Sequence, residues 1–347
     1  MNPRGTERRQ RWRGALQTLR VLVTGGLLAV VCARINISQL VGTLANARLG
    51  DLLLGLGSIV CARYLGAFQM KRLMDTVGIA FSVWQVVVVN LSAAFYELVL
   101  PAAQLSGGMV RLHRFSQPKR QGRQQALAAI LFNRFMDTLT LVALGLAFWA
   151  LHHPAGRAQT AIGAALSGLL VALLAFHLEV KHGKLSSAAA RWPLLQACWR
   201  AAPQGLRGVA EHLVGHTVRS YRRFRLAHAA MLPVAALSLA RHLLLIASVG
   251  CFARAISLKV PWMVFGWLRS VVVLLTMLPI SVWGFGLREG SLVVLLAPFG
   301  VAASDAVALS IVMFVAGLLF GALGGVVELA YALDAGRKLR QARTAAS

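Results

Sequence analysis

The chain has 347 residues, of which 58% are hydrophobic and 14% are charged, and its mean hydropathy is +0.67. Soluble domains average about 45–50% apolar and about 25% charged residues. The composition therefore excludes an ordinary soluble enzyme, a disordered protein and a disulfide-rich secreted scaffold. Lysine and arginine outnumber aspartate and glutamate by 36 to 11, which gives a net charge of +25. Because this charge accompanies long apolar runs, it predicts an all-α, polytopic membrane protein with cationic loops and not a nucleic-acid-binding protein.

Eight apolar segments are long enough to cross a bilayer as helices, which takes about 20 residues each. They are 18–35, 49–69, 79–100, 126–150, 159–179, 228–252, 262–280 and 306–331. We interpret the first as an uncleaved span, because no small-residue cleavage site follows its apolar run. A further apolar stretch, 291–303, is interrupted by Pro298 and is too short to span comfortably alone.

The charge pattern predicts three parts and an orientation. A basic N-terminus covers 1–17, a transmembrane domain covers 18–335 and a basic tail covers 336–347. Arginine-rich loops face the cytoplasm, so both termini and the segment 181–227 are expected there, in a protein of the bacterial inner membrane. The segment 181–227 is typical either of surface helices on an anionic leaflet or of a positively charged topology anchor.

The same rule conflicts with a simple count of crossings. Segment 79–100 starts on the cytoplasmic side beside Lys71 and Arg72, and the cationic stretch 111–123 belongs on that side too. One full crossing cannot begin and end on one side of the membrane. A broken or re-entrant segment resolves the conflict, and the same difficulty recurs near 279–303.

Two interruptions carry the same order of residues. The first reads LPAAQLSGGMVR over 100–111, and the second reads LPISVWGFGLRE over 278–289. Proline removes a helical hydrogen bond and glycine permits unusual dihedrals. Broken backbone is not tolerated against lipid, and paired broken segments indicate a transporter's binding site. Helix N-termini and an arginine there suit an anionic group. The alternative is that proline and glycine merely kink packed spans.

The breaks supply most of the candidate substrate-binding residues. These are Pro101, Ser106, Gly107, Gly108, Arg111, Pro279, Ser281, Gly284, Gly286, Arg288 and Glu289. Glu289 is expected to hold Arg288 or to couple to a proton.

The second break resembles the lysylphosphatidylglycerol synthase transmembrane-region family, also called flippase-like. The likeness is carried by LPISVWGFGLREGS over 278–291 and PFGV over 298–301. It extends over about 15–335 as a pattern of spans, although only the two breaks are specific. The first break departs from the family pattern at Ala102, Ala103 and Met109. The resemblance implies a lipid-translocation domain, which in this family is fused to a cytosolic aminoacyl-transferase or stands alone. We see no transferase segment in this sequence, so lysyl transfer is not expected.

Ionisable residues inside the spans complete the candidate site. Arg134 and Asp137 are three positions apart and share one helix face, where they could form a buried pair facing the bundle. A structural role is the favoured interpretation of this pair. Arg241 and Arg269 lie near the middle of their segments, and one of them is expected to face a substrate cavity inside the bundle.

Enzyme signatures are weak. No two acidic residues are spaced i,i+3 or i,i+4, and the four cysteines are far apart. We therefore expect no catalytic residue, metal or cofactor, and a transporter is favoured over an enzyme.

The sequence thus predicts a helix bundle of about eight spans with two broken or re-entrant segments. Its expected function is to move an anionic lipid or a lipid-linked phosphate between leaflets. One alternative is a membrane enzyme or accessory subunit in lipid headgroup or lipid-linked sugar metabolism, and another is a scaffold that transports nothing. The expected partners are anionic membrane lipids and a membrane-bound synthase.

Overall fold

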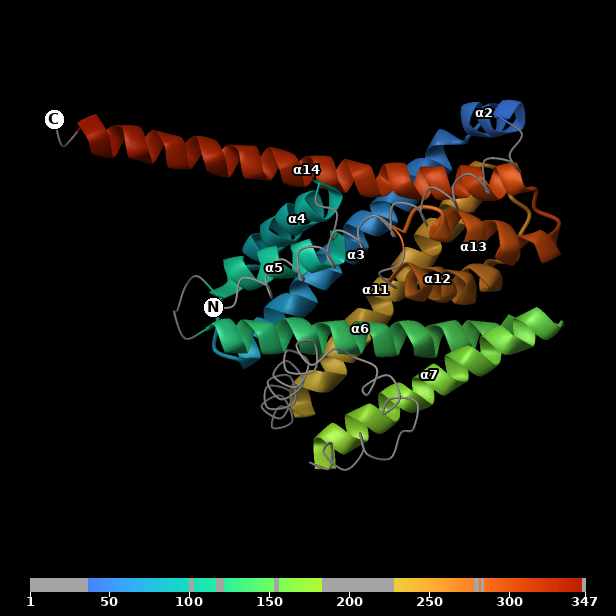
Figure 1. Cartoon of the computed structure of the whole chain (residues 1–347), viewed down its shortest axis with the longest axis horizontal. Coiled ribbons are helices and arrows are strands. Elements are labelled where there is room, and N and C mark those ends of the chain that lie inside the picture. The colour runs from blue at the N-terminus through green and yellow to red at the C-terminus, as the bar shows by residue number, and fades with distance from the viewer. Residues whose placement is uncertain are drawn as a thin grey trace, which may run out of the picture. The chain divides into compact units, whose positions relative to one another are not determined.

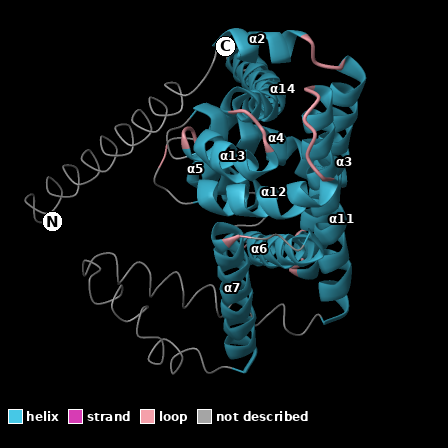
Figure 2. Cartoon of the chain, turned by 90° about the vertical axis from the view of Figure 1, so that its right-hand side faces the viewer, coloured by secondary structure: helices cyan, strands magenta, loops and turns pink. Residues whose placement is uncertain are grey.

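A computed structural model describes residues 37–99, 103–116, 122–152, 156–182, 228–277, 281 and 284–344. Within these ranges the chain is helical and has no strand, as Figure 1 and Figure 2 show, so the all-α prediction is confirmed. The helices are α2 (Ile37–Ala45), α3 (Leu49–Thr76), α4 (Val83–Val99), α5 (Ala103–Ser116), α6 (Arg123–His152), α7 (Arg157–His182), α11 (His228–Ala255), α12 (Trp262–Met277), α13 (Leu287–Leu296), the 3-10 turn η1 (Ala297–Phe299) and α14 (Ala303–Thr344).

Five of the described helices are long and apolar enough to cross a membrane, namely α3, α6, α7, α11 and α14. They coincide with five of the eight predicted spans. The predicted spans 79–100 and 262–280 correspond to shorter apolar helices, α4 with 17 residues and α12 with 16. Both shorter helices end where the sequence predicts a break. The first predicted span, 18–35, and the basic segment 1–17 lie outside the described residues, as does the basic segment 181–227 from residue 183 onward.

The chain divides into two compact units. Unit 1 comprises Met1–Val60, Asn90–Gly107 and Leu245–Ser347, and unit 2 comprises Cys61–Val89 and Gly108–Leu244. Helices α3, α4, α5 and α11 therefore contribute residues to both.

In unit 1, helix α14 packs against α2 and α13, and α13 packs against α12. Figure 1 and Figure 2 both show α12 and α13 side by side. Asp305 in the first turn of α14 holds α2, because it accepts hydrogen bonds from Thr43 Oγ1 at 2.9 Å and from Gln39 Nε2 at 3.3 Å. Arg254 at the C-terminal end of α11 forms an ion pair of 2.6 Å with the buried Asp51 at the N-terminal end of α3.

Glycines bring α4 and α14 into close contact. A Cβ at Gly324 would collide with the backbone carbonyl of Leu91, and a Cβ at Gly321 would meet the Leu98 side chain at 2.8 Å. Small residues let the backbones of membrane helices approach closely, and dispersion contacts then replace the missing hydrophobic driving force.

Unit 2 has its own apolar core. The core takes buried side chains from five helices, including Ala67, Met70, Leu73, Met74, Val86, Phe115, Ala129, Phe132, Met136 and Val234. Helices α6 and α7 form a hairpin in which Trp149 Nε1 donates to the Gln159 carbonyl at 3.0 Å. This packed core holds the polar side chains of unit 2 that are described below.

Candidate functional site

The second break is a left-handed glycine turn between α12 and α13. Gly284 and Gly286 have φ values of +73° and +77°, which side chains rarely adopt. Gly284 also lies against Thr276, whose Cγ2 would be 2.9 Å from an added Cβ. Gly286 is the residue before α13, and its backbone N–H donates to Glu289 Oε2 at 2.7 Å. The chain's own carboxylate therefore occupies the N–H group that the sequence suggested for an anionic ligand.

Arg288 and Glu289 form an ion pair in the first turn of α13. Arg288 Nη2 lies 2.8 Å from Glu289 Oε1, and Arg288 Nε donates to Ser310 Oγ of α14 at 2.7 Å. Ser310 Oγ in turn donates to Glu289 Oε1 at 2.6 Å. The side chains of Arg288 and Glu289 are 16% and 8% exposed, so water screens this pair weakly.

Two aromatic rings enclose the same guanidinium. Its central carbon lies 5.7 Å from the Phe285 ring centroid and 5.5 Å from that of Phe314. Each such cation–π contact contributes about 0.5–2 kcal/mol. We call these two rings with Arg288, Glu289 and Ser310 the Arg288 cluster. Glu289 and Ser310 take the Nε and Nη2 side of the guanidinium, and Nη1 has no partner in the described part of the chain.

The first break reverses the direction of the chain. Helix α4 ends at Val99 and α5 begins at Ala103. Ser106 Oγ donates to the Tyr96 carbonyl at 3.2 Å, and Gly107 lies directly against the Glu97 side chain. Residues ten positions apart are therefore neighbours, so the start of α5 folds back along α4. A reversal of the chain here is the feature that the predicted broken or re-entrant segment requires.

The two breaks differ in how they use glycine. Gly107 and Gly108 lie inside the regular helix α5, and neither has a positive φ. Helix α5 begins at Ala103, so the serine and both glycines of the first motif fall in the helix. Gly284 and Gly286 instead form the turn itself. The two breaks therefore share an order of residues but differ in backbone conformation.

Helix α14 connects the surroundings of both breaks within unit 1. Ser310 and Phe314 contact the Arg288 cluster, Gly321 packs against Leu98, and Glu328 Oε2 accepts a hydrogen bond of 3.3 Å from Tyr96. Phe314, Gly321 and Glu328 follow Ser310 by 4, 11 and 18 positions, close to whole turns at about 3.6 residues each. They share one face, and Phe314 and Gly321 are about 10 Å apart along the axis.

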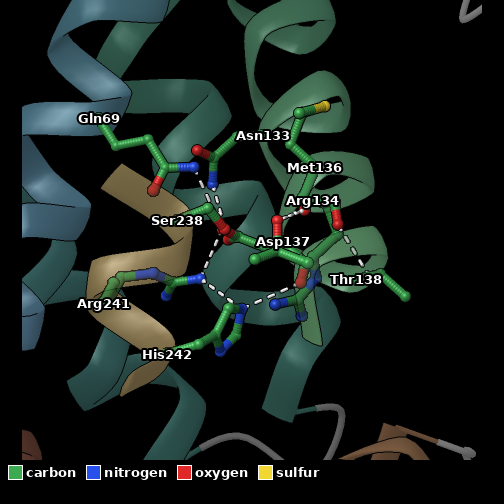
Figure 3. Close-up of polar contacts among 10 residues, drawn as sticks. Gln69, Asn133, Arg134, Met136, Asp137, Thr138, Ser238, Arg241 and His242 are labelled. Carbon is green, nitrogen blue, oxygen red and sulfur yellow. Dashed lines mark hydrogen bonds and ion pairs between the residues drawn. The ribbon is translucent and has the colours of Figure 1, made fainter. Parts of the chain in front are cut away.

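Unit 2 contains a buried polar cluster around Asp137, drawn in Figure 3. Asp137 Oδ1 lies 2.5 Å from Arg241 Nη2 and accepts from Gln69 Nε2 at 3.1 Å and Ser238 Oγ at 3.0 Å. Asp137 Oδ2 accepts from Asn133 Nδ2 at 3.1 Å. His242 Nε2 lies 3.0 Å from the Asp137 carbonyl oxygen and 3.5 Å from Arg241 Nη2. We call these six residues the Asp137 cluster.

The structure differs from the expected pair of Arg134 and Asp137. The cation beside Asp137 is Arg241 of α11, whereas Arg134 is exposed. The two residues do share α6, but a helix presents positions three apart about 60° away from each other. Asp137 faces the core of unit 2, and Arg134 lies on the exposed side of the helix.

Arg269 lies on a cavity in unit 1, of about 180 Å³. The cavity is lined by Ile59, Leu245, Ser248, Val249, Phe252, Leu268, Arg269, Val272, Val273, Leu292 and Met313. Arg269 is the one charged residue in this lining, and the other ten residues are uncharged.

The comparison with known families matches residues 17–325 to the model described as the lysylphosphatidylglycerol synthase TM region. The chain belongs to this family. A comparison with curated proteins finds no match. As a member of a family of transmembrane regions that also has five span-length helices, the chain is a multi-pass membrane protein. The resemblance seen in the sequence is thereby confirmed.

The remaining predicted residues of this family member are placed as follows. Pro101 and Pro279 lie outside the described residues. Gly108 and the half-buried Arg111 belong to unit 2. Ser281 has a buried hydroxyl with no hydrogen-bond partner among the described residues. No group of three or more metal-binding side chains occurs in the ranges that the structure describes.

Sequence reasoning missed the residues that complete both clusters. Ser310 and Phe314 of α14 bind the Arg288 cluster, and Gln69, Asn133 and Ser238 bind Asp137. Ser310 and Phe314 are four apart on one helix, but this spacing is also common in ordinary packing faces. Contacts between helices distant in sequence decide which polar residues meet, and one sequence contains no signal for them.

Proposed function

We propose that this protein is a lipid translocase that moves an anionic lipid, or a lipid-linked phosphate, between the leaflets of a bacterial inner membrane. The observation that carries the proposal is the Arg288 cluster. A guanidinium is held at a break in a membrane helix, with one edge bound by the chain and its Nη1 without a partner in the described residues. Guanidinium groups bind phosphate oxygens through paired N–H donors, which suits a phosphate headgroup.

The pairing of Arg288 with Glu289 gives the proposed site a means to release its cargo. A guanidinium whose charge is fully uncompensated would hold a phosphate tightly, and transport needs binding that is weak enough to reverse. Glu289 Oε1 lies 2.8 Å from Arg288 Nη2 and offsets this charge. The phosphate would approach the Nη1 edge while Glu289 retains the Nε edge. Arg288 would then keep Glu289 as its counter-ion both before the phosphate binds and after it leaves.

The finer features of the proposal follow the charge pattern. Both termini and Arg111 would be cytoplasmic. The substrate would be an anionic membrane lipid, and a membrane-bound synthase would supply or use it. We assign Asp137 and Arg241 a structural role, because each satisfies the charge of the other.

The test is lipid exchange in vesicles reconstituted with the full chain. Fluorescent phosphatidylglycerol is placed in both leaflets, and an impermeant reductant bleaches the outer one, so continued bleaching reports movement. Arg288→Lys keeps the charge but loses the planar fork, and we expect exchange to slow about tenfold, as for the loss of one charge-assisted contact. Arg288→Ala is less suitable alone, because it leaves the buried Glu289 without its cation.

A double change removes that complication. Arg288→Gln with Glu289→Gln removes both charges and keeps an oxygen that can accept the Gly286 N–H. We expect this variant to fold and to lose exchange. Arg72→Ala is the matched control, since Arg72 also lies over a phenylalanine ring, that of Phe68, but is remote from the break in sequence. Exchange at the wild-type rate in the double variant would overturn the proposal and favour the scaffold.

A further inference from the structure

The apolar cavity of unit 1 directly adjoins the Arg288 cluster. Leu292 lines the cavity and follows Arg288 by four residues on α13, so the two lie on one face, about 6 Å apart along the axis. Met313 lines the cavity and follows Ser310 by three residues on α14. On both α13 and α14, a residue of the Arg288 cluster is therefore followed about one turn later by a residue that lines the cavity.

The chemistry of the lining selects an apolar occupant. Ten of the eleven lining residues are uncharged, and seven of these ten belong to α11 or α12. Ser248, the one hydroxyl among them, donates to the Leu245 carbonyl of its own helix at 2.8 Å. Water is stable in a cavity only where it finds two to four polar partners. Only the Arg269 and Ser248 side chains of this lining carry polar groups, so hydrocarbon fits the space better than water.

The volume fits part of a chain. An apolar cavity of about 150 Å³ accommodates a six-carbon ring in another protein. At about 180 Å³ this cavity has room for a similar number of carbons. It therefore holds one segment of a hydrocarbon chain, not a whole lipid.

We propose that this cavity binds the first carbons of an acyl chain belonging to the phospholipid whose phosphate contacts Arg288. The inference rests on the proposed function for the identity of that phosphate contact. An acyl chain is the occupant because phospholipid tails surround any membrane-embedded chain at very high local concentration, and mass action favours the most abundant ligand. A charged head beside a dry cavity also matches the two ends of a phospholipid.

The experiment uses the full chain in phosphatidylcholine vesicles that contain a phosphatidylglycerol with a diazirine near the carboxyl end of one acyl chain. Light attaches the probe to its neighbours, and mass spectrometry locates the adducts. We expect adducts on cavity residues of α11 and α12, around Val249 and Val272. Val273→Phe places a ring in the cavity and should reduce these adducts at least about fivefold, because added bulk in a filled space is not tolerated.

Two further variants keep the result interpretable. Val294→Phe is the matched control, since Val294 is 69% exposed on α13 and does not line the cavity, and its adducts should equal those of the wild type. Val273→Leu adds a single carbon and should give an intermediate loss even if the phenylalanine variant does not fold. Unlabelled phosphatidylglycerol should compete for the adducts.

Three results would overturn the inference. Adducts confined to lipid-facing positions would place the chain elsewhere. Undiminished cavity labelling in Val273→Phe and Val273→Leu would show that the tail does not enter. Stronger competition by a polyprenyl phosphate than by phosphatidylglycerol would assign the cavity to an isoprenoid chain. Labelling requires no transport, so cavity adducts in a protein that exchanges no lipid would refute only the proposed function, and exchange without cavity adducts would refute only this inference.

Discussion

At the scale of single residues, the chain neutralises its membrane charges in pairs. Asp137 has four donors, including Arg241, and Glu289 is matched by Arg288 and Ser310. An ionised side chain within a membrane segment is costly unless it is paired. The Asp137–Arg241 pair joins two helices that are distant in sequence, since Asp137 lies on α6 and Arg241 on α11. The Arg288–Glu289 pair lies on α13 alone and reaches α14 through Ser310.

Removing the charge of Asp137 should destabilise unit 2. In Asp137→Asn the half-buried Arg241 loses its counter-ion, and removing one partner of a buried pair costs about 2–4 kcal/mol. Unfolding in mixed micelles of mild detergent and dodecyl sulfate measures the change. Gln124→Ala is the control on the same helix, and because this glutamine is exposed its effect should stay within about 0.5 kcal/mol.

A second substitution shows whether the loss arises from the unpaired charge. Arg241→Gln added to Asp137→Asn removes that charge, so it should recover more than half of the lost stability. If Asp137→Asn unfolds at the wild-type denaturant concentration, the pair is not a structural contact of the kind described.

The sequence predicts the ionisable residues but not their partners. Apolar runs make Asp137, Arg241 and Glu289 conspicuous, because a charge in such a run is rare. The partner of Glu289 is its neighbour Arg288 and is therefore readable from the sequence. The partner of Asp137 lies more than one hundred positions further on, beyond any helical spacing, and Arg134 is the plausible but different choice nearby.

At the scale of elements, hydropathy predicts the helices well and the breaks partly. Long apolar runs become α3, α6, α7, α11 and α14, because backbone hydrogen bonds must be satisfied inside the segment. Leu-Pro marks both interruptions correctly. The role of glycine is not readable, since Gly107 is a packing residue of a helix and Gly284 forms a turn. The difference depends on where each turn closes.

The contact of α4 with α14 requires that residue 324 have no side chain, and this can be tested by mutation. In Gly324→Ala the new Cβ would collide with the Leu91 carbonyl, which is backbone and cannot rotate away. The helices would have to separate, which we expect to cost about 1–3 kcal/mol. Gly317→Ala is the matched control on the same helix, where nothing lies within 4 Å.

The control variant Gly317→Ala should be at least as stable as the wild type. Alanine is favoured over glycine inside a helix by about 1 kcal/mol, so Gly317→Ala should leave stability unchanged or raise it. Thermal unfolding of the purified protein in detergent compares the two variants. Equal melting temperatures for both would mean that α4 and α14 do not approach as closely as described.

At the scale of the whole molecule, the membrane sets the orientation of the chain. Cationic segments remain on the cytoplasmic side, so both termini are expected there. In a variant without the four native cysteines, Arg4→Cys and Arg340→Cys should react with an impermeant maleimide only after the cells are opened. His153→Cys, expected on the opposite side, should react in intact cells. Reaction of either terminus in intact cells would reverse the topology.

The length of α14 makes the protein sensitive to bilayer thickness. Its apolar part, Ala303–Leu333, has 31 residues and is about 46 Å long, whereas the hydrocarbon layer measures about 30 Å. A helix with such a hydrophobic mismatch must tilt steeply, thicken the bilayer around it or shield its surplus with protein, at fractions of a kcal/mol per Å. The face that carries Ser310, Phe314, Gly321 and Glu328 lies within this stretch. A thicker membrane would therefore reduce the mismatch of α14, a helix that touches the surroundings of both breaks.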